Sequence, residues 1–355
     1  MNPTEIDVFN GDADGLFAAH QLRLAEPGPD PARVEVVTGL KREIGLLERI
    51  ALPIAPAHAE RQVPRGAPVS PRGRRAGGEG ADARPLQLRV FDIALGRNRP
   101  ALDRLLAAGA TVRWFDHHHP GVVPEHPRLR AVIDTAPDTC TSLIVDRELR
   151  GAHRRWAVAA AFGDNLTAVA HALGVAGGLG ERELAQLREL GEAVNYNGYG
   201  ETLDDVLLAP AALYARLSPY GDPLDFARDD PLVSELAARR RGDLAIAVQL
   251  PPWRESATGA VFVLPDEAWS RRVLGGFANL LAERSSASAF AVLKARTDGS
   301  YMASVRAPLD RPRGTDRLCR RFGGDGRAGA GGIDRLAADQ LDAFACAFEQ
   351  HDWGR

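Results

Sequence analysis

The sequence predicts an α/β protein with a doubly wound, mainly parallel sheet in its first half, a helical connector and a smaller C-terminal α/β domain. Short β-like runs alternate with helical runs up to about residue 150, and helical runs alone fill 156–241. The alternation then returns after residue 242. Strand–helix alternation implies a parallel sheet with helices on both faces. We therefore expect an N-terminal domain at 1–185, a connector at 186–241 and a C-terminal domain at 242–355.

The elements of the first half follow from apolar runs bounded by turn residues and from 3.6-residue periodicity. We expect strands at 5–10, 33–38, 86–92, 110–116 and 129–134. We expect helices at 15–25, 40–52, 101–109 and 141–149. Residues 53–85 are rich in Pro, Gly, Ala and Arg without periodicity, which predicts a flexible surface insertion. A basic arm that contacts a nucleic-acid backbone is the weaker alternative for this insertion.

The second half is predicted from the same signals. Helices are expected at 154–162, 166–174, 181–194, 231–240, 269–284 and 337–351. Strands are expected at 243–250, 259–265, 288–296 and 300–307, the last two forming a hairpin around the turn "TDGS".

Composition and charge exclude several classes of protein. The chain of 355 residues is 45% hydrophobic and 26% charged, as in ordinary globular proteins. A net charge of -3 excludes a global positive field for nucleic acid but leaves a local basic groove open. Three unpaired cysteines, an acidic N-terminus and the lack of a long apolar window predict a soluble cytoplasmic protein without membrane contact. The sequence sets no oligomeric state and leaves a homodimer open.

Acidic residues follow the ends of several predicted strands. Asp12 and Asp14 lie in "GDADG", Asp92 ends "LRVFD", and Asp116 ends "VRWFD" before three histidines. Asp164 follows a helical run in "AFGDN". Ligands of open parallel sheets bind beyond the carboxyl ends of the strands, so we expect these side chains to meet at one edge.

Crowded carboxylates repel one another unless cations neutralise them. Carboxylates with imidazole and without thiolate suit Mn²⁺ or Mg²⁺, with Fe²⁺ or Co²⁺ as alternatives. The number of acids exceeds what one ion needs and favours two ions about 3.5–4 Å apart, the arrangement used for in-line displacement at phosphorus. Each motif alone is also typical of a turn, a helix cap or an exposed loop. Their joint occurrence at strand ends favours the metal site.

The motifs "GDADG", Asp92, Asp116-His117-His118 and Asp164 resemble the four ordered motifs of the DHH phosphoesterase superfamily, in its RecJ-like and nanoRNase-like branches. They cover about the first 165 residues. The histidine that nanoRNase-like members carry just upstream of the first motif is absent here, where Phe9-Asn10-Gly11 stand.

The resemblance implies a role for each residue of these motifs. Asp12 would bind one Mn²⁺ ion, Asp14 the other, and Asp92 would bridge the two. His117 and Asp164 would complete the shell of one ion, and Asp116 would orient His117. His118 would contact the phosphoryl oxygen or the leaving group, while His119 has no catalytic role. A water acidified by two Mn²⁺ ions, which Mg²⁺ or Co²⁺ could replace, would attack phosphorus in line.

The glycine-rich stretch "FGGDGRAGAGGI" resembles the signature of the DHH-associated (DHHA1) domain, which binds substrate. On that resemblance, Arg327 stands where the family has histidine, and Arg306 matches an upstream arginine. Gly323, Gly324, Arg306, Arg327 and His118 are the predicted substrate-binding residues. Near the domain junction, Asn195 and Asn197 are expected either to line the cleft or to cap turns.

The resemblance implies a hydrolase that cleaves phosphodiester bonds of short oligonucleotides. Three alternatives of the same class stay open: a small phosphorylated metabolite, a cyclic dinucleotide and pyrophosphate, the last disfavoured because lysines are so few. A non-catalytic nucleic-acid-binding protein is the alternative of another class, and the intact acids argue against it. The sequence does not determine the polarity of cleavage or the preference for DNA or RNA.

Overall fold

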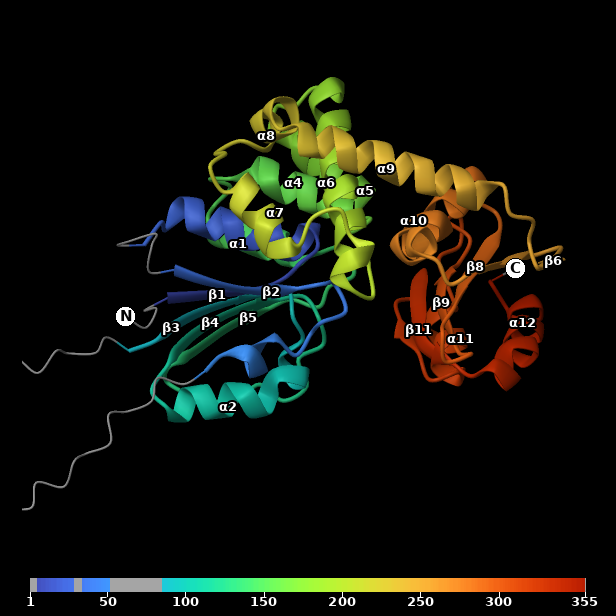
Figure 1. Cartoon of the computed structure of the whole chain (residues 1–355), viewed down its shortest axis with the longest axis horizontal. Helices are drawn as coiled ribbons and strands as arrows, with labels where there is room; N and C mark the ends of the chain where they lie inside the picture. The colour runs from blue at the N-terminus through green and yellow to red at the C-terminus, as the bar shows by residue number, and fades with distance from the viewer. Residues whose placement is uncertain (1–4, 29–33, 52–84, 355) are drawn as a thin grey trace, which may run out of the picture.

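The structure is a computed structural model that describes residues 5–28, 34–51 and 85–354. The predicted insertion at 53–85 lies, apart from Pro85, outside the described residues. Two sheets, each covered by helices on both faces, form the two ends of the described chain (Figure 1).

Five parallel strands form the first sheet, in the order β2-β1-β3-β4-β5. These strands are β1 (Glu5–Asn10), β2 (Val34–Gly39), β3 (Gln87–Phe91), β4 (Thr111–Asp116) and β5 (Leu129–Ile133). The chain runs from β1 to β2 on one side and then crosses to β3 on the other side. Ligands bind where the winding direction changes in this way, here between β1 and β3. The predicted doubly wound α/β class is confirmed.

Both faces of this sheet are buried, as expected for parallel strands. Phe9 packs under α1 (Ala13–Ala25), α3 (Thr141–Glu148) and α4 (Arg154–Gly163). Its neighbour Val8 packs on the opposite face, in the core that α2 (Arg99–Ala107) and the short 3₁₀ helix η2 (Leu46–Arg49) cover (Figure 1). Successive strand residues therefore serve two separate cores.

A helical layer follows the first sheet and packs into the core over α1. It consists of α5 (Thr167–Ala176), α6 (Glu181–Gly198), α7 (Pro210–Leu217), α8 (Pro223–Asp229) and α9 (Pro231–Val248). The predicted domain limits at 185 and 241 fall inside α6 and α9. These limits stay a prediction, and the shared core favours grouping the layer with the first sheet.

The C-terminal sheet has six strands in the order β10-β11-β9-β8-β7-β6, and only β7 and β8 pair in parallel. The strands are β6 (Arg254–Ser256), β7 (Gly259–Leu264), β8 (Ala289–Ala295), β9 (Tyr301–Arg306), β10 (Asp325–Gly326) and β11 (Ala330–Leu336). Helix α10 (Ala268–Arg284) covers one face, and α11 (Thr315–Arg321) and α12 (Leu341–Glu349) cover the other. The predicted hairpin of 288–296 with 300–307 is confirmed as β8 and β9.

Two predicted elements are wrong. The helix expected at 40–52 is a turn followed only by η2, because Lys41 N donates to the Gly198 carbonyl and Leu40 N donates to the Glu43 carboxylate. The strand expected at 243–250 is mostly the end of α9, in which Leu244 and Ala247 are buried and Ile246 is 48% exposed. A short apolar run does not separate strand from helix, and the face buried against the fold decides.

The sequence prediction also missed α7 and α8, which begin with Pro210 and Pro223 at the first helical turn. Proline is common at that position because its missing N–H is not needed there. Within the described residues, none of the helices combines the length and apolarity needed to cross a bilayer.

Candidate metal and phosphate site

The predicted acids meet at the carboxyl edge of the first sheet. Asp12 and Asp14 follow β1, Asp92 follows β3 and Asp116 ends β4. Together with Lys41, Asn10, His117 and His118, most of this group lines a cavity of about 850 Å³. Asp164, at the end of α4, lines the same cavity. The structure thus brings together side chains that are up to 152 residues apart in the chain, Asp12 to Asp164.

The first loop is held by its own backbone. Asp12 caps α1 by accepting a hydrogen bond from Gly15 N at 3.1 Å. A side chain at Gly15 would lie 2.2 Å from the Asn10 carbonyl oxygen, so glycine is required at this turn. Asp14 is fully enclosed, and its two oxygens accept hydrogen bonds from Thr141 N and Ser142 N, each at 2.7 Å. The first turn of α3 therefore fixes Asp14.

Asp92 lies at the centre of the site. Its φ of +57° is unusual for a residue other than glycine. Its Oδ1 accepts from Thr141 Oγ1 at 3.0 Å and lies 3.4 Å from His117 Nε2 and 3.9 Å from His118 Nδ1. Strained backbone of this kind is concentrated at functional sites, where it aims a side chain.

Asp116 pairs with a different histidine from the one predicted. Its Oδ1 lies 2.7 Å from His118 Nδ1, whereas the family resemblance led us to expect that Asp116 orients His117. The prediction is wrong because both ring nitrogens of His117 have other partners, Asp92 at Nε2 and Arg327 at Nδ1. Asp116 is fully buried, while the His118 side chain remains 44% exposed. Asp116 thus binds the Nδ1 atom of an imidazole that is accessible to solvent. His119 is exposed and accepts a hydrogen bond from Gly121 N.

His117 connects the two halves of the chain. Its side chain is only 8% exposed, and its Nδ1 lies 3.1 Å from Nη2 of Arg327 in the β10–β11 hairpin. Arginine has no acceptor, so His117 Nδ1 must accept, and Nε2 then carries the proton toward Asp92. A ring that binds a cation through Nε2 carries its proton on Nδ1 instead. The Arg327 contact and cation binding by His117 therefore exclude each other.

Burial and mutual repulsion dominate the electrostatics of the cluster. Burial, together with the charge of Asp92, raises the pKa of Asp14 to about 7. Burial likewise raises the pKa of Asp92 and of Asp164. Burial lowers the pKa of His117, but the hydrogen bond to Asp92 and the charge of Asp164 outweigh it and raise that pKa to about 10. The acids thus outweigh the positive charge of Lys41, and protonation of His117 would end its hydrogen bond with Arg327, because the cationic ring has no lone pair.

The chemistry of the donor set fits a divalent cation. Ligand atoms of Asp92, His117 and His118 all lie within 4.8 Å of one another. Two buried oxygens, Asn10 Oδ1 and Asp116 Oδ2, have no hydrogen-bond partner. Oxygen and imidazole donors without thiolate are typical of Mn²⁺ sites. Asp12 and Asp14 are less available to a cation than Asp92, because both carboxylate oxygens of each already accept hydrogen bonds within the protein.

The opposite wall of the cavity comes from the C-terminal sheet and carries the two predicted arginines. Arg306 hydrogen-bonds Asn279 Oδ1 at 2.6 Å and Ser304 Oγ at 3.0 Å. Arg327 donates to the Pro137 carbonyl at 2.6 Å. Among the described ion pairs neither arginine has a carboxylate partner, whereas Arg188, Arg240 and Arg272, which also line the cavity, do. Arg306 and Arg327 thus remain available to an anion.

The predicted glycines Gly323 and Gly324 are not among the residues that line this cavity, and their role in substrate binding stays a prediction. Gly323 has a φ of +78°, and both residues donate to carbonyls of α11, ending that helix. Within the glycine-rich stretch, the glycines that line the cavity are those after Asp325, among them Gly326 and Gly329. Of the two asparagines, Asn195 lines the cavity, while the Asn197 side chain binds the backbone of Leu207 and Leu208.

Sequence reasoning missed Lys41 and Tyr199. Lys41 Nζ lies 2.5 Å from Asp12 Oδ2 and 5.0 Å from the centre of the Tyr199 ring. Burial raises the pKa of Asp12, but Lys41 outweighs it, and that pKa lies below its ordinary value. The one available signal was rarity, since Lys41 and Lys294 are the only lysines in the sequence.

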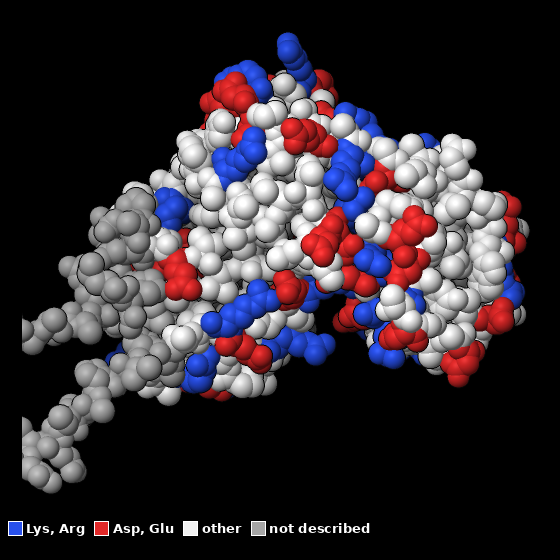
Figure 2. Space-filling view, in the orientation of Figure 1, with Lys and Arg blue, Asp and Glu red and all other residues white. Residues whose placement is uncertain are grey.

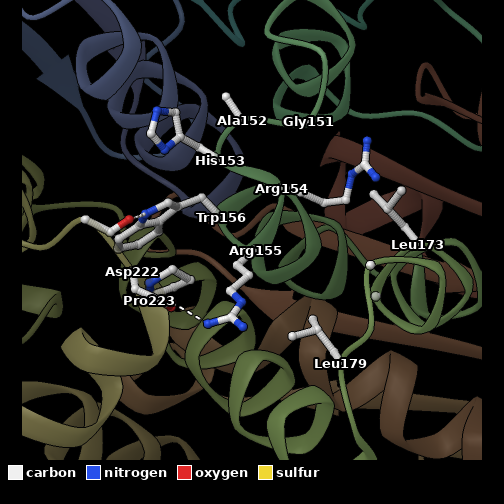
Figure 3. A pocket seen from close by; sticks show the side chains of 13 residues that line it. Gly151, Ala152, His153, Arg154, Arg155, Trp156, Leu173, Leu179, Asp222 and Pro223 are labelled. Atoms are coloured by element: carbon white, nitrogen blue, oxygen red, sulfur yellow. Dashed lines mark hydrogen bonds and ion pairs between the residues drawn. The ribbon is translucent and has the colours of Figure 1, made fainter.

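A second cavity, of about 370 Å³, lies away from the acids at the start of α4 (Figure 3). Its arginines are already neutralised, because Arg155 pairs with Asp222 and Arg154 pairs with Asp146. The Trp156 ring nitrogen donates to the Gly221 carbonyl. Of these two cavities, the larger one is therefore the better candidate for binding an anion.

Comparison with known proteins supports the fold. No protein-family model matches the sequence, and no curated protein matches it significantly. RecJ from Thermus thermophilus in complex with Mn²⁺ matches with a TM-score of 0.50 and 19% identity, over 98% of this chain and 52% of RecJ. The chain thus spans about half the length of that protein. This match confirms the RecJ-like α/β fold that the motifs predicted.

Two further solved structures match less closely in shape. An exonuclease RecJ bound to manganese matches with a TM-score of 0.45 and 21% identity, over 98% of this chain and 89% of that one. The pGpG-specific phosphodiesterase PggH from Vibrio cholerae matches with a TM-score of 0.46 and 15% identity, over 97% and 96% of the two chains.

Binding of Mn²⁺ should tighten at least about tenfold between about pH 6 and about pH 8. A carboxyl with a pKa of about 7 goes from about a tenth to about nine-tenths ionised over this range, and His117 must also lose a proton. Isothermal titration calorimetry in buffers of different ionisation enthalpy measures both the affinity and the protons released. An affinity that is equal at the two pH values would contradict this electrostatic description.

Proposed function

We propose that this chain is a divalent-metal-dependent phosphoesterase that hydrolyses phosphodiester bonds of short oligonucleotides. One observation carries the proposal: the cluster of Asp92, His117 and His118 faces Arg306 and Arg327 across one cavity. An acidic wall suits cations and a basic wall suits phosphate, so the cavity offers both partners of metal-assisted phosphoryl transfer.

The size of the cavity and the surface charge favour a short substrate. A volume of about 850 Å³ is of the order that holds a small ligand. On the face drawn in Figure 2, basic and acidic side chains are interspersed and gather where the two halves meet. A long single strand would require a continuous basic track along the surface. A dinucleotide or the end of a short oligonucleotide fits the cavity without one.

Each residue would have one task in this reaction. Asp92 and His117, with Asp164 nearby, would hold Mn²⁺. The ion would supply positive charge and acidify the attacking water. Arg306 would hold a non-bridging phosphoryl oxygen by charge-assisted hydrogen bonds. Arg327 would do the same once His117 no longer accepts its hydrogen bond.

His118 would act as the general acid. Burial lowers its pKa, but the hydrogen bond to Asp116 and the charge of Asp92 outweigh it, so the pKa lies above its ordinary value. As the bond from phosphorus to the leaving oxygen breaks, His118 would donate a proton to that oxygen. Asp116 would hold the imidazolium and its orientation, as a positioning residue.

A panel of substrates with Mn²⁺ tests the proposal directly. We expect turnover of dinucleotides and 5-mers of RNA or DNA, with little on pyrophosphate. Asp92→Ala should abolish it, by at least about a thousandfold, because this residue contacts both histidines. Turnover only of cyclic dinucleotides or of phosphoadenosine phosphate would move the substrate class to the small-molecule alternative. Tight oligonucleotide binding without turnover would favour the non-catalytic alternative.

His118→Ala should lower kcat by about a hundredfold to ten-thousandfold, with a smaller effect on KM. His119→Ala is the matched control, because His119 is the next residue and is exposed. Steady-state kinetics on a dinucleotide distinguish them. Equal losses in both variants would show that the loop, rather than the general acid, matters.

Arg327→Ala should mainly raise KM, by about tenfold or more, because it removes a phosphate contact and leaves the acids intact. Arg335→Ala is the control, since Arg335 lies on β11 of the same hairpin but pairs with Asp298 outside the cavity. An unchanged KM in Arg327→Ala would exclude a substrate contact for this residue.

A further inference from the structure

Hydrogen bonds of its backbone fix the position of Lys41 independently of its side chain. Lys41 N donates to the Gly198 carbonyl at 3.0 Å, and its own carbonyl accepts from Asn10 Nδ2 at 3.3 Å. The turn is closed by Glu43, whose carboxylate accepts from Leu40 N at 2.7 Å. These bonds replace the helix that the sequence predicts here. The segment therefore forms a turn instead of a regular helix, and this turn places Lys41 at the cavity.

The side chain of Lys41 enters the acidic cluster. Its Nζ lies 2.5 Å from Asp12 Oδ2 and 3.4 Å from Asn195 Oδ1, above the ring of Tyr199. Among the described residues, Lys41 is the one lysine or arginine paired with any of the four carboxylates predicted as metal ligands. The chain otherwise uses arginine almost throughout, since Lys294 is its only other lysine. A lysine ammonium is a compact point charge, closer to a metal ion than the planar guanidinium of arginine is.

The acids divide into two sets. Asp92, His117 and His118 have ligand atoms within 4.8 Å of one another. Asp12 is held by Gly15 N and Lys41, and Asp14 by the first turn of α3. A divalent ion can bind the first set if it replaces the proton on His117 Nε2, which also ends the hydrogen bond between Arg327 and His117 Nδ1. To reach Asp12, an ion must displace an ammonium group that already provides positive charge.

Charge balance favours the same division. Four carboxylates, Asp12, Asp14, Asp92 and Asp164, give about four negative charges. One divalent ion with Lys41 gives about three positive charges, and two ions with Lys41 give about five, which exceeds the acids before substrate arrives. A second ion would therefore meet net repulsion unless Lys41 moved away.

We propose that Lys41 is a built-in cation that takes the place of one of the two predicted metal ions. The chain then binds one divalent ion tightly, at Asp92 and His117, and binds a second only when Lys41 leaves Asp12. This inference rests on the proposed function only for the nature of the ion. It makes Lys41 a residue that sets the metal stoichiometry of the site, and its ammonium stabilises Asp12 in the single-ion state.

Manganese stoichiometry tests the inference without any substrate. We expect isothermal titration calorimetry of the full chain to give one Mn²⁺ per chain in the tight phase. The electron paramagnetic resonance spectrum should be that of an isolated Mn²⁺ ion. Lys41→Met should add a second ion, bound at least about tenfold more tightly than in the original chain, with a spin-coupled spectrum because two ions would lie about 4 Å apart. Lys41→Arg keeps the charge and should keep a single ion.

Two results would overturn the inference. One is a pair of spin-coupled ions, bound with similar affinity, in the unaltered chain, a measurement that needs no variant to fold. The other is a folded Lys41→Met chain, checked by circular dichroism, with the stoichiometry and affinities of the unaltered chain. Failure of the proposed function is separate: a chain that binds one Mn²⁺ but cleaves no phosphodiester would sink the hydrolase and leave the role of Lys41 standing.

Discussion

The repulsion among buried carboxylates at the carboxyl edge of the first sheet is the constraint on which the site depends. Asp12, Asp14 and Asp92 are nearly inaccessible to solvent, and Asp164 faces the same cavity. Buried carboxylates either protonate or acquire partners. The fold supplies only some of those partners: one lysine, two helix N-termini, one threonine hydroxyl and two histidines. The negative charge that remains is the reason to expect a cation at this edge.

The surrounding structure keeps these side chains in place despite that repulsion. The N-terminal turn of α3 holds Asp14, and the buried Asp116 holds His118. Asp92 itself has a left-handed backbone conformation, which directs its side chain into the site. The second sheet then closes the cavity with the hairpin that carries Arg327. Arg327 occupies the nitrogen of His117 that would carry the proton if His117 bound a cation through Nε2. Binding of a metal ion by His117 would therefore release Arg327 toward a phosphate.

The positions of the strands in the first half and the acids at their ends could be predicted from the sequence, because parallel strands carry a strong apolar signal and turns carry glycine and aspartate. Pairings across the fold could not. Asp116 binds His118 rather than His117 because both nitrogens of His117 have other partners, Asp92 and Arg327. Gly323 and Gly324 end a helix rather than line the cavity. The segment around Lys41 forms a turn despite its helical pattern, because Lys41 N donates a hydrogen bond to the carbonyl of Gly198, which is distant in the sequence. Helix periodicity carries no information about such partners.

The most direct test of the central claim is a crystal structure of the chain grown with Mn²⁺, with an anomalous difference map collected at the manganese edge. We predict a peak coordinated by Asp92 and His117, with Arg327 no longer bound to His117 Nδ1. Saturating Mn²⁺ with no peak at Asp92, or with His117 still accepting from Arg327, would contradict that claim.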